Sequence, residues 1–168
     1  MVTIRTGTKD DAARLAELFE RQWRLQQSYD TTGTPMPDSM DHVLARLQRE
    51  HGVVLVAEGA SDIVGYVDIG VVGRGRGGSD GRRIRLLPRR VGPVVAPRRY
   101  GFVFDLYVVD EDRRHGVGES LLTAALGWLS DQGVDEVEAR IAAANEVAQS
   151  FFACHGFGEV ATLRRKVL

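Results

Sequence analysis

The feature that most constrains this chain is a stretch near its middle, where an apolar strand runs into a polar turn and the turn opens directly into a helix. Residues 102–109 are rich in β-branched and aromatic side chains, as a buried strand requires. Residues 116–132 place Val117, Leu121, Ala125 and Trp128 at helical spacing, and Gly133 follows as a stop signal. A strand joined in this way to an amphipathic helix is typical of α/β proteins, and we expect that class here.

The turn itself, Arg113-Arg114-His115-Gly116-Val117-Gly118, has the chemistry of an anion site. The first N–H groups of a helix have no intrahelical partner and lie at the positive end of the macrodipole. The two glycines would let an anion approach the backbone closely, and the two arginines add charge. Taken alone, a turn that uses glycine only for its geometry explains the pattern equally well. A dinucleotide-binding motif would want a third glycine, which is absent near Leu121.

The remaining chain divides into further elements of both kinds. Residues 2–6 predict a strand, Thr8 and Asp11 have the spacing of a capping box before a helix, and Ser39 is the predicted N-cap of a second helix. Residues 53–58 and 63–72 predict a hairpin, and 82–87 could extend a strand. Residues 137–142 predict a strand, 146–154 a helix and 157–167 a final strand or two. Hairpin and crossover connections together predict a mixed sheet with helices on both faces.

Length and composition indicate one soluble domain over residues 1–168. The chain has 43% hydrophobic and 27% charged residues and a net charge of −1. No apolar run is long enough for a membrane span, and the first residues lack the pattern of a signal peptide. Cys154 is the sole cysteine, so no internal disulfide can form. We therefore expect a cytoplasmic protein, and the strong preference for Arg over Lys suggests a GC-rich bacterial genome.

Residues 74–99 stand apart, because they hold nine arginines and one acid, Asp80. We interpret them first as a mobile loop or insertion and second as a lid over an acceptor site. Nucleic-acid binding is not expected, since the stretch has no stacking aromatic before Tyr100. No metal site is expected either, because the four histidines lack ligand-like spacing.

Two segments together carry a resemblance to a known family. The strand, acidic turn, Arg-x-x-Gly-x-Gly and helix of residues 105–118 look like the pyrophosphate-binding motif of the GNAT (GCN5-related) N-acetyltransferases. Residues 145–157, Asn-Glu-Val-Ala-Gln-Ser-Phe-Phe-Ala-Cys-His-Gly-Phe, resemble the family's Asn-x-x-Ala-x-x-Phe-Tyr-x-x-x-Gly-Phe segment. The opening strand, first helix and hairpin follow in family order, so the resemblance covers nearly the whole chain apart from residues 74–99.

The resemblance implies where acetyl-CoA, the co-substrate, would bind. The strand ending near Val108 should splay from the strand at 137–142, with the pantetheine arm in the gap. Asn145 would contact that arm or tie down the following helix. The predicted cofactor-binding residues are Leu106, Val108 and Val109 for the arm, Arg113, Arg114, His115, Gly116, Val117, Gly118, Glu119 and Ser120 for the pyrophosphate, and Asn145 and Phe152 beside them.

Phe152 is a departure from the family pattern, because the corresponding tyrosine protonates the departing thiolate. A phenyl ring cannot donate a proton, and general acid catalysis is typically worth ~10²–10⁴-fold. A thiol has a pKa of about 8.5, so its thiolate is nevertheless a fair leaving group. Tyr107 is a candidate substitute donor if it faces the cleft.

Asp105 is the candidate catalytic carboxylate, because only a neutral amine attacks a thioester and a carboxylate could take the proton. An equally good interpretation makes it a strand residue that positions a loop or the acceptor amine. The expected function is acetyl transfer to a primary amine of a small molecule or peptide by direct attack, since no covalent nucleophile is evident. The alternative is a non-catalytic acyl-CoA-binding module. The family often dimerises, so a homodimer is one expected assembly.

Overall fold

The computed structural model describes residues 2–29, 38–73 and 99–162. In chain order the elements are β1 (Thr3–Thr6), η1 (Lys9–Asp11), α1 (Ala12–Tyr29), α2 (Ser39–Leu47), β2 (Gly52–Glu58), β3 (Ile63–Val72), β4 (Tyr100–Val108), η2 (Asp110–Asp112), α3 (Val117–Asp131), β5 (Val137–Ala139) and α4 (Glu146–Cys154). The predicted strands at 2–6, 53–58, 63–72 and 102–109 and the helices at 116–132 and 146–154 are confirmed to within a few residues.

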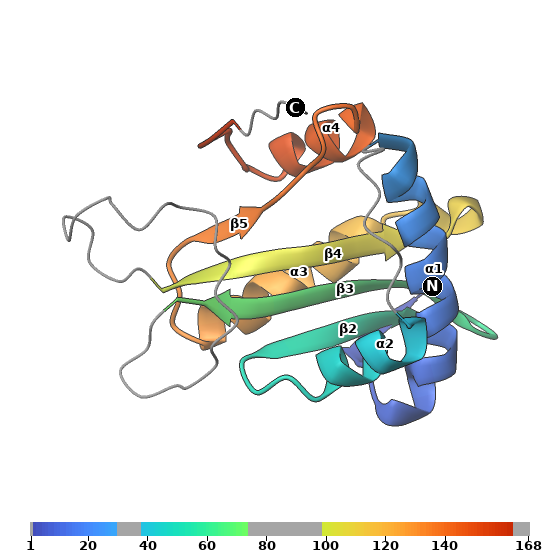
Figure 1. The fold of residues 1–168 in the computed structure, drawn as a ribbon. Coiled ribbons are helices and arrows are strands. Elements are labelled where there is room, and N and C mark those ends of the chain that lie inside the picture. Colours follow the sequence, from blue (N-terminus) through green and yellow to red (C-terminus); the bar gives the residue numbers. More distant parts are fainter. Residues whose placement is uncertain (1, 30–37, 74–98, 163–168) are drawn as a thin grey trace, which may run out of the picture.

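The five strands form one sheet in the order β1-β2-β3-β4-β5 (Figure 1). Pairs β1–β2, β2–β3 and β3–β4 are antiparallel, and β4–β5 is parallel. The parallel pair extends over only three positions, from Gly101 opposite Val137 to Val103 opposite Ala139. Beyond Val103, β4 continues to Val108 without β5 beside it. The expected mixed, mostly antiparallel sheet that splays between its fourth and fifth strands is therefore confirmed.

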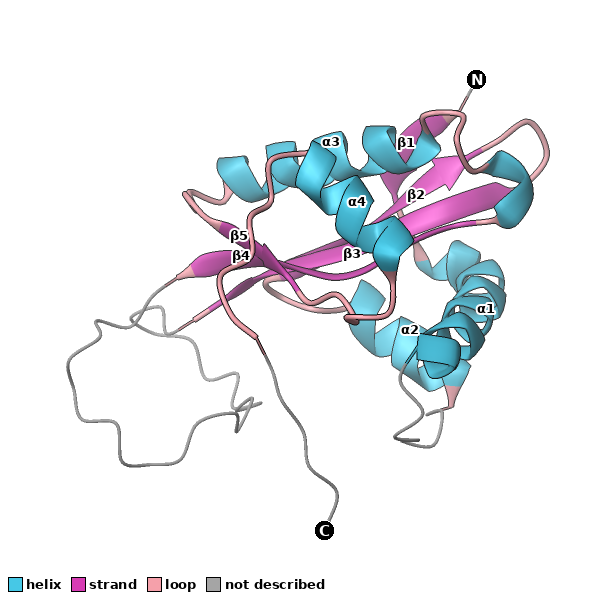
Figure 2. Ribbon diagram, turned by 90° about the horizontal axis from the view of Figure 1, so that it is seen from above, coloured by secondary structure: helices cyan, strands magenta, loops and turns pink. Residues whose placement is uncertain are grey.

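Helices cover both faces of the sheet (Figure 2). One face carries α1 and α2 over a core cluster that includes Leu18, Val56 and Tyr66. The other face carries α3 and α4 over a cluster that includes Leu121 and Leu129. Both faces of the central strands are thus buried, which explains why β2 and β3 are nearly continuous apolar runs in the sequence.

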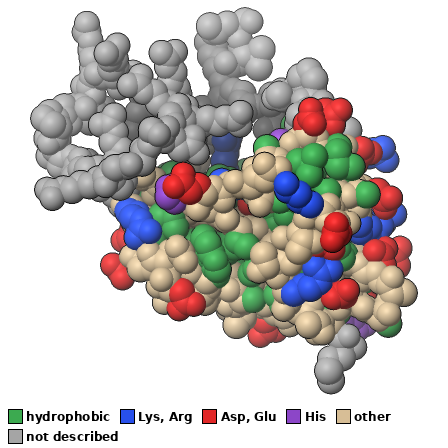
Figure 3. All heavy atoms as spheres, turned by 90° about the horizontal axis from the view of Figure 1, so that it is seen from below, with side chains coloured by type: hydrophobic (Ala, Val, Ile, Leu, Met, Phe, Trp, Pro, Cys, Tyr) green, Lys and Arg blue, Asp and Glu red, His purple; other side chains and the backbone are tan. Residues whose placement is uncertain are grey.

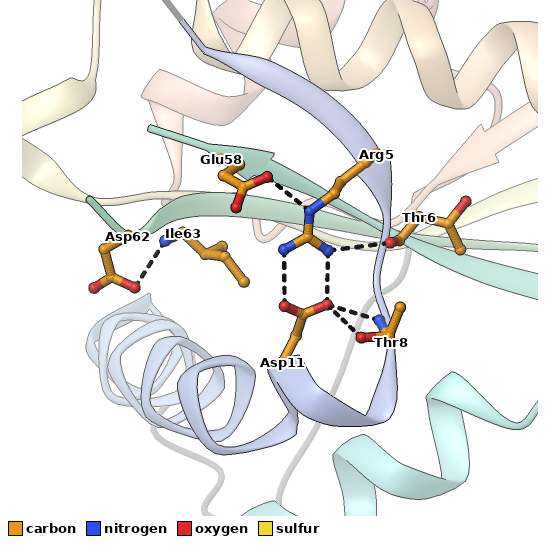
Figure 4. A network of polar contacts seen from close by, with 7 residues as sticks. All are labelled: Arg5, Thr6, Thr8, Asp11, Glu58, Asp62 and Ile63. Atoms are coloured by element: carbon orange, nitrogen blue, oxygen red, sulfur yellow. Dashed lines mark hydrogen bonds and ion pairs between the residues drawn. The ribbon is translucent and has the colours of Figure 1, made fainter. Parts of the chain in front are cut away.

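The junction between β1 and α1 is held by a charged network at the first edge of the sheet (Figure 4). Arg5 donates two hydrogen bonds to the Asp11 carboxylate, at 2.8 and 2.9 Å, and one to Glu58 at 2.8 Å. The Thr8 N–H donates to Asp11 at 2.7 Å, as the capping-box spacing predicted. These hydrogen bonds, that from Arg5 foremost, lower the pKa of Asp11 to about 2.

The predicted N-cap of the second helix was wrong. The N-cap of α2 is Asp38, whose carboxylate accepts from the N–H groups of Met40 and Asp41, while Ser39 donates its hydroxyl to Glu20. A carboxylate is a strong partner for the positive helix end, so Asp38 takes the position that we assigned to Ser39.

The predicted strands near the C-terminal end are shorter or missing. β5 ends at Ala139, because the neighbouring strand diverges and leaves no backbone partner for residues 140–142. Residues 157–162 are not in a strand, and 163–167 lie outside the described residues. The predicted strand extension at 82–87 also lies outside the described residues. So does the segment 74–99 that we interpreted as a loop or lid, apart from Arg99.

Candidate active site

The turn between β4 and α3 presents a helix N-terminus without a side-chain cap. Gly116 is the N-cap residue of α3, with a left-handed φ of 79°, and no described side chain accepts a hydrogen bond from the N–H groups of this first turn. Arg114 is also left-handed, with a φ of 62°. Arg114, His115 and Gly116 are exposed. The first N–H groups of α3 therefore lie at the positive end of the macrodipole, where an anion can reach them.

The side chain of Arg113 folds back onto the strand. Its Nε donates to the Val108 carbonyl at 2.9 Å, and its Nη2 lies 2.7 Å from Asp110 Oδ1. The guanidinium carbon is 5.5 Å from the ring centroid of Tyr107. Arg113 thus shapes the turn. The exposed Arg114 makes no comparable hydrogen bond to a described residue of β4.

Gly118 lies where α3, β4 and α4 meet. A Cβ built on Gly118 would lie 3.5 Å from the Phe151 ring and 3.9 Å from Leu106. This region adjoins the part of β4 that has no β5 partner. Glycine at this position keeps the space between the first turn of α3 and the splayed strand free of a side chain.

The backbone groups predicted to meet the pantetheine arm are partly engaged within the protein. The Val108 carbonyl accepts from Arg113, and the Val109 N–H donates to the Val64 carbonyl at 2.9 Å. Leu106 pairs with Val67 on the opposite side from β5. Their contact with a cofactor stays a prediction.

The other predicted cofactor residues lie on α3 and α4. Val117 is buried, and Glu119 and Ser120 are exposed, with the Ser120 hydroxyl donating to the Gly116 carbonyl at 2.9 Å. Asn145 caps α4 by accepting from the Ala148 N–H at 3.0 Å. The Phe152 side chain is 7% exposed and packs edge-on against Phe151 and Phe157.

Asp105 points to the other face of the sheet, toward α1 and α2. Its Oδ1 accepts from Gln22 Nε2 at 2.7 Å, and its Oδ2 accepts from the Arg46 guanidinium. The Asp105 side chain keeps 16% of its surface exposed. Tyr107 is buried on the same face beside Tyr66. The proton-accepting role of Asp105 and the proton-donating role of Tyr107 therefore stay predictions.

Behind Asp105 lies a polar network that the sequence analysis missed. Arg46 contacts Asp68 as well as Asp105, and Arg49 donates to Asp68 at 2.7 and 3.0 Å. The Tyr66 hydroxyl donates to Gln22. One signal was visible: Asp68 is an acidic residue inside an otherwise apolar strand, at residues 63–72.

Burial governs the ionisation of this network. Desolvation of the completely buried Asp68 raises its pKa, although Arg46 and Arg49 oppose the shift. Desolvation alone would lower the pKa of Arg46, but the charges of Asp68 and Asp105 outweigh it and the pKa is raised. Desolvation also raises the pKa of Tyr66 well above its usual value. Arg46 therefore stays charged and Tyr66 neutral at ordinary pH.

One other hollow in the described part of the chain could hold a ligand. A hollow of about 350 Å³ lies between α1 and η2 and is lined by Arg21, Arg24, Leu25, Tyr107, Asp110, Glu111 and Arg113. On the face shown in Figure 3, basic and acidic side chains are interspersed.

No group of three or more His, Cys, Asp or Glu in the described ranges could hold a metal ion. No described helix has the length and apolarity to cross a membrane.

The sequence profile of the Acetyltransferase (GNAT) family matches residues 13–157, which contain both motifs and the splayed strands. The chain belongs to the GNAT acetyltransferase family. A curated relative, the uncharacterized N-acetyltransferase YhfO of Bacillus subtilis, is 26% identical over 160 residues, covering 94% of this chain and 91% of YhfO. The expected family is thus confirmed.

Solved structures share the GNAT fold at low sequence identity. The BH1408 protein of Bacillus halodurans, as a tetramutant, has a TM-score of 0.81 at 20% identity and 99% coverage of both chains. The aminoglycoside N-acetyltransferase AAC(6′)-Iy in complex with CoA has a TM-score of 0.73 at 18% identity, covering 100% of this chain and 95% of its own. The same enzyme is also known with a CoA-derived bisubstrate analogue. The expectation of acetyl-CoA as co-substrate is confirmed at the level of the family.

Proposed function

We propose that this protein transfers the acetyl group of acetyl-CoA to a primary amine by direct attack within a ternary complex. The observation that carries the proposal is the uncapped, glycine-lined first turn of α3 beside the splayed end of β4. A family profile that spans both features supports it. Relatives of similar fold are aminoglycoside acetyltransferases, so a small-molecule amine is a reasonable acceptor.

The residues of the site are suited to hold acetyl-CoA. The N–H groups of residues 114–120 would hold the pyrophosphate, because they lie at the positive end of α3. The space beside Gly118, between Leu106 and Phe151, would admit the pantetheine arm. The bound co-substrate supplies an activated acetyl group in the form of a thioester.

The chemistry requires a neutral amine held against that thioester. The amine nitrogen bonds to the carbonyl carbon, the carbon–sulfur bond breaks, sulfur leaves with its electron pair, and the amine proton passes to a carboxylate or to water. Asp105 is the candidate for orienting the amine, because it is a carboxylate on β4 with part of its surface exposed. Direct attack is favoured over an acetylated enzyme, since no hydrogen bond among the described residues joins Cys154 to a general base, and His155 Nδ1 contacts the Phe151 carbonyl instead.

Acetyl-CoA binding is tested first by thermal unfolding. We expect acetyl-CoA at about 100 times its dissociation constant to stabilise the protein by about 2.7 kcal/mol. Gly118→Glu should abolish the shift by placing a carboxylate against the bound pyrophosphate and arm. Gly127→Glu is the matched control, because Gly127 lies on the same helix with open space around it.

Transfer is tested by mass spectrometry on a panel of primary amines with acetyl-CoA. Acetylated product that depends on the protein, and that Gly118→Glu abolishes, supports the proposal. A folded Gly118→Glu variant that still shows the full thermal shift would place the cofactor elsewhere.

The second candidate function is an acyl-CoA-binding module without turnover. Phe152 favours it, because the residue where the family commonly has a proton-donating tyrosine is a buried phenyl ring. A thermal shift with acetyl-CoA together with no acetylated amine in the panel would support this alternative.

A further inference from the structure

The cluster behind Asp105 joins four charged side chains from α2, the turn after it, β3 and β4. Arg46 contacts both Asp68 and Asp105. Arg49 binds Asp68 from the other side. Two basic and two acidic side chains therefore meet in the cluster.

Arg46 is held in place by contacts that do not depend on Asp105. Its partner Asp68 has a side chain only 1% exposed, so a broken ion pair there would leave a buried charge. Asp68 is in turn fixed by Arg49, whose guanidinium stacks on Phe104 at 4.4 Å and fits beside Gly70. A Cβ on Gly70 would lie 3.2 Å from Arg49 Nη1, so glycine makes room for this side chain.

The second oxygen of Asp105 is held by an equally defined chain. Tyr66 donates its hydroxyl to the Gln22 amide oxygen, which leaves the Gln22 amide nitrogen to donate to Asp105 at 2.7 Å. Each carboxylate oxygen of Asp105 thus has one protein partner and further lone pairs to offer. The cavity beside this network has a volume of about 10 Å³, room for one water molecule at most, so an acceptor must reach Asp105 from its exposed side.

A carboxylate paired in this way can orient an amine by hydrogen bonding, but the neighbouring positive charge weakens its attraction for an ammonium. The Arg46 charge offsets that of Asp105, and a guanidinium does not deprotonate in proteins. We therefore expect the acceptor to meet Asp105 as a neutral amine whose proton has passed to water. At pH 7 about one in ten α-amines of pKa near 8 is neutral, against about one in 2,500 lysine-type amines of pKa near 10.4.

We propose that the acceptor is a weakly basic primary amine, with a pKa near 8 or below, and that Arg46 determines this preference by neutralising Asp105. The inference rests on the proposed acetyl transfer and adds the class of acceptor to it. Arg46 acts here as a positioning residue, because it acts on the acceptor through Asp105.

The first test compares two probes under acetyl-CoA at pH 7: a lysine-free dipeptide amide with a free α-amine, and Nα-acetyl-lysine methylamide. The double variant Arg46→Gln/Asp68→Asn keeps the net charge of the cluster and leaves Asp105 without its arginine. We expect the kcat/KM of the lysine probe relative to the α-amine probe to rise at least about tenfold in this variant. Without Arg46, Asp105 can bind the protonated amine and take its proton, which removes the penalty of a small neutral fraction, and that penalty is larger for the lysine probe.

Two control variants isolate the role of the Arg46 charge. Arg46→Lys, which keeps the positive charge, should shift the ratio less than the double variant. Arg5→Gln is the matched remote control, because Arg5 also bridges two carboxylates, Asp11 and Glu58, at the opposite edge of the sheet, and it should leave the ratio unchanged. A folded double variant with the wild-type ratio would overturn the inference.

The second test needs only the wild-type protein. With no effective protein base, kcat/KM for each amine that is acetylated should rise about tenfold per pH unit up to the pKa of that amine. A plateau well below the amine pKa would reveal a protein base and overturn the inference while leaving acetyl transfer intact. Absence of acetylation across amines of pKa from about 6 to about 10.5 would overturn the proposed function itself, and this inference with it.

Discussion

At the scale of single residues, the orientation of Asp105 decides how the site can work. Its side chain faces α1 and α2, where Gln22 and Arg46 each bond one carboxylate oxygen. A carboxylate with two fixed partners is well placed to accept a hydrogen bond from a substrate amine. The sequence left two roles open for Asp105, as a proton acceptor or as a residue that positions the acceptor amine. These two hydrogen bonds favour the positioning role.

Asp105→Asn should therefore weaken acceptor binding more than it slows the chemical step. We expect the acceptor KM to rise about tenfold while kcat falls less, because the amide keeps the shape but loses an anionic acceptor. The stabilisation by acetyl-CoA should be unchanged, since the pyrophosphate site lies at the start of α3. Steady-state kinetics with any amine that is acetylated will measure both constants. A fall in kcat of ~10²–10⁴ that shrinks at high pH would instead identify Asp105 as the base.

Phe152→Tyr tests whether the missing proton donor limits turnover. The ring packs edge-on against Phe151 and Phe157, and the residue stands at the position where the family commonly has a tyrosine. We expect kcat to stay unchanged or to rise, because a tyrosine can protonate the departing thiolate. Melting temperature serves as the folding control. A large fall in kcat in a folded variant would show that the phenyl ring itself packs against the thioester.

At the scale of elements, α2 and α3 differ in what binds the first backbone N–H groups of each helix. It carries Arg46, and its N-terminus is capped by Asp38 through two backbone N–H groups. The N-terminus of α3 differs, since its first helical turn has no described side-chain cap. The same backbone groups are satisfied internally in one helix and presented outward in the other, which is what an anion site requires.

Asp38→Ala should destabilise the protein by about 1 kcal/mol, the usual cost of losing an N-cap. Ser39→Ala is the paired comparison, because Ser39 only bonds the Glu20 side chain and should cost less. Urea denaturation of the two variants measures the difference. A larger loss for Ser39→Ala than for Asp38→Ala would contradict the assignment of the cap.

At the scale of the whole molecule, one sheet separates two cores and leaves an opening at one edge. The α3 face is packed by Leu121, Leu122 and Leu129, all completely buried, and the α1 face by Leu18 and Val56. The α3-side core also includes Phe152 of α4, and Val137 and Ala139 of β5 pack against it. The part of β4 beyond Val103, which has no β5 partner, lies beside this core.

Acid stability should report the network that ties the β1 edge to α1. Asp11 has a folded pKa of about 2, lowered from 3.8 chiefly by the hydrogen bond from Arg5. Its contribution is therefore fully present above about pH 4 and lost as the pH falls toward 2. Asp11→Asn should cost about 1 kcal/mol at pH 7, because solvent screens a partly exposed pair, and the variant and wild type should converge below pH 2. Urea denaturation from pH 7 to pH 2 measures this difference, and a constant difference across that range would contradict the assignment.

The sequence by itself determined the order of elements, the family motifs and the turn before α3, because periodicity, glycine placement and helix ends are local properties of the chain. The lengths of β5 and of the final segment were not predictable, since a strand forms only where a neighbouring backbone can pair with it. Arg46 and Asp105 are 59 residues apart, and Gln22 and Asp105 are 83 apart. Only the tertiary structure brings these side chains together, because α1 and α2 must first pack on the sheet before their polar groups can meet the carboxylates of β3 and β4.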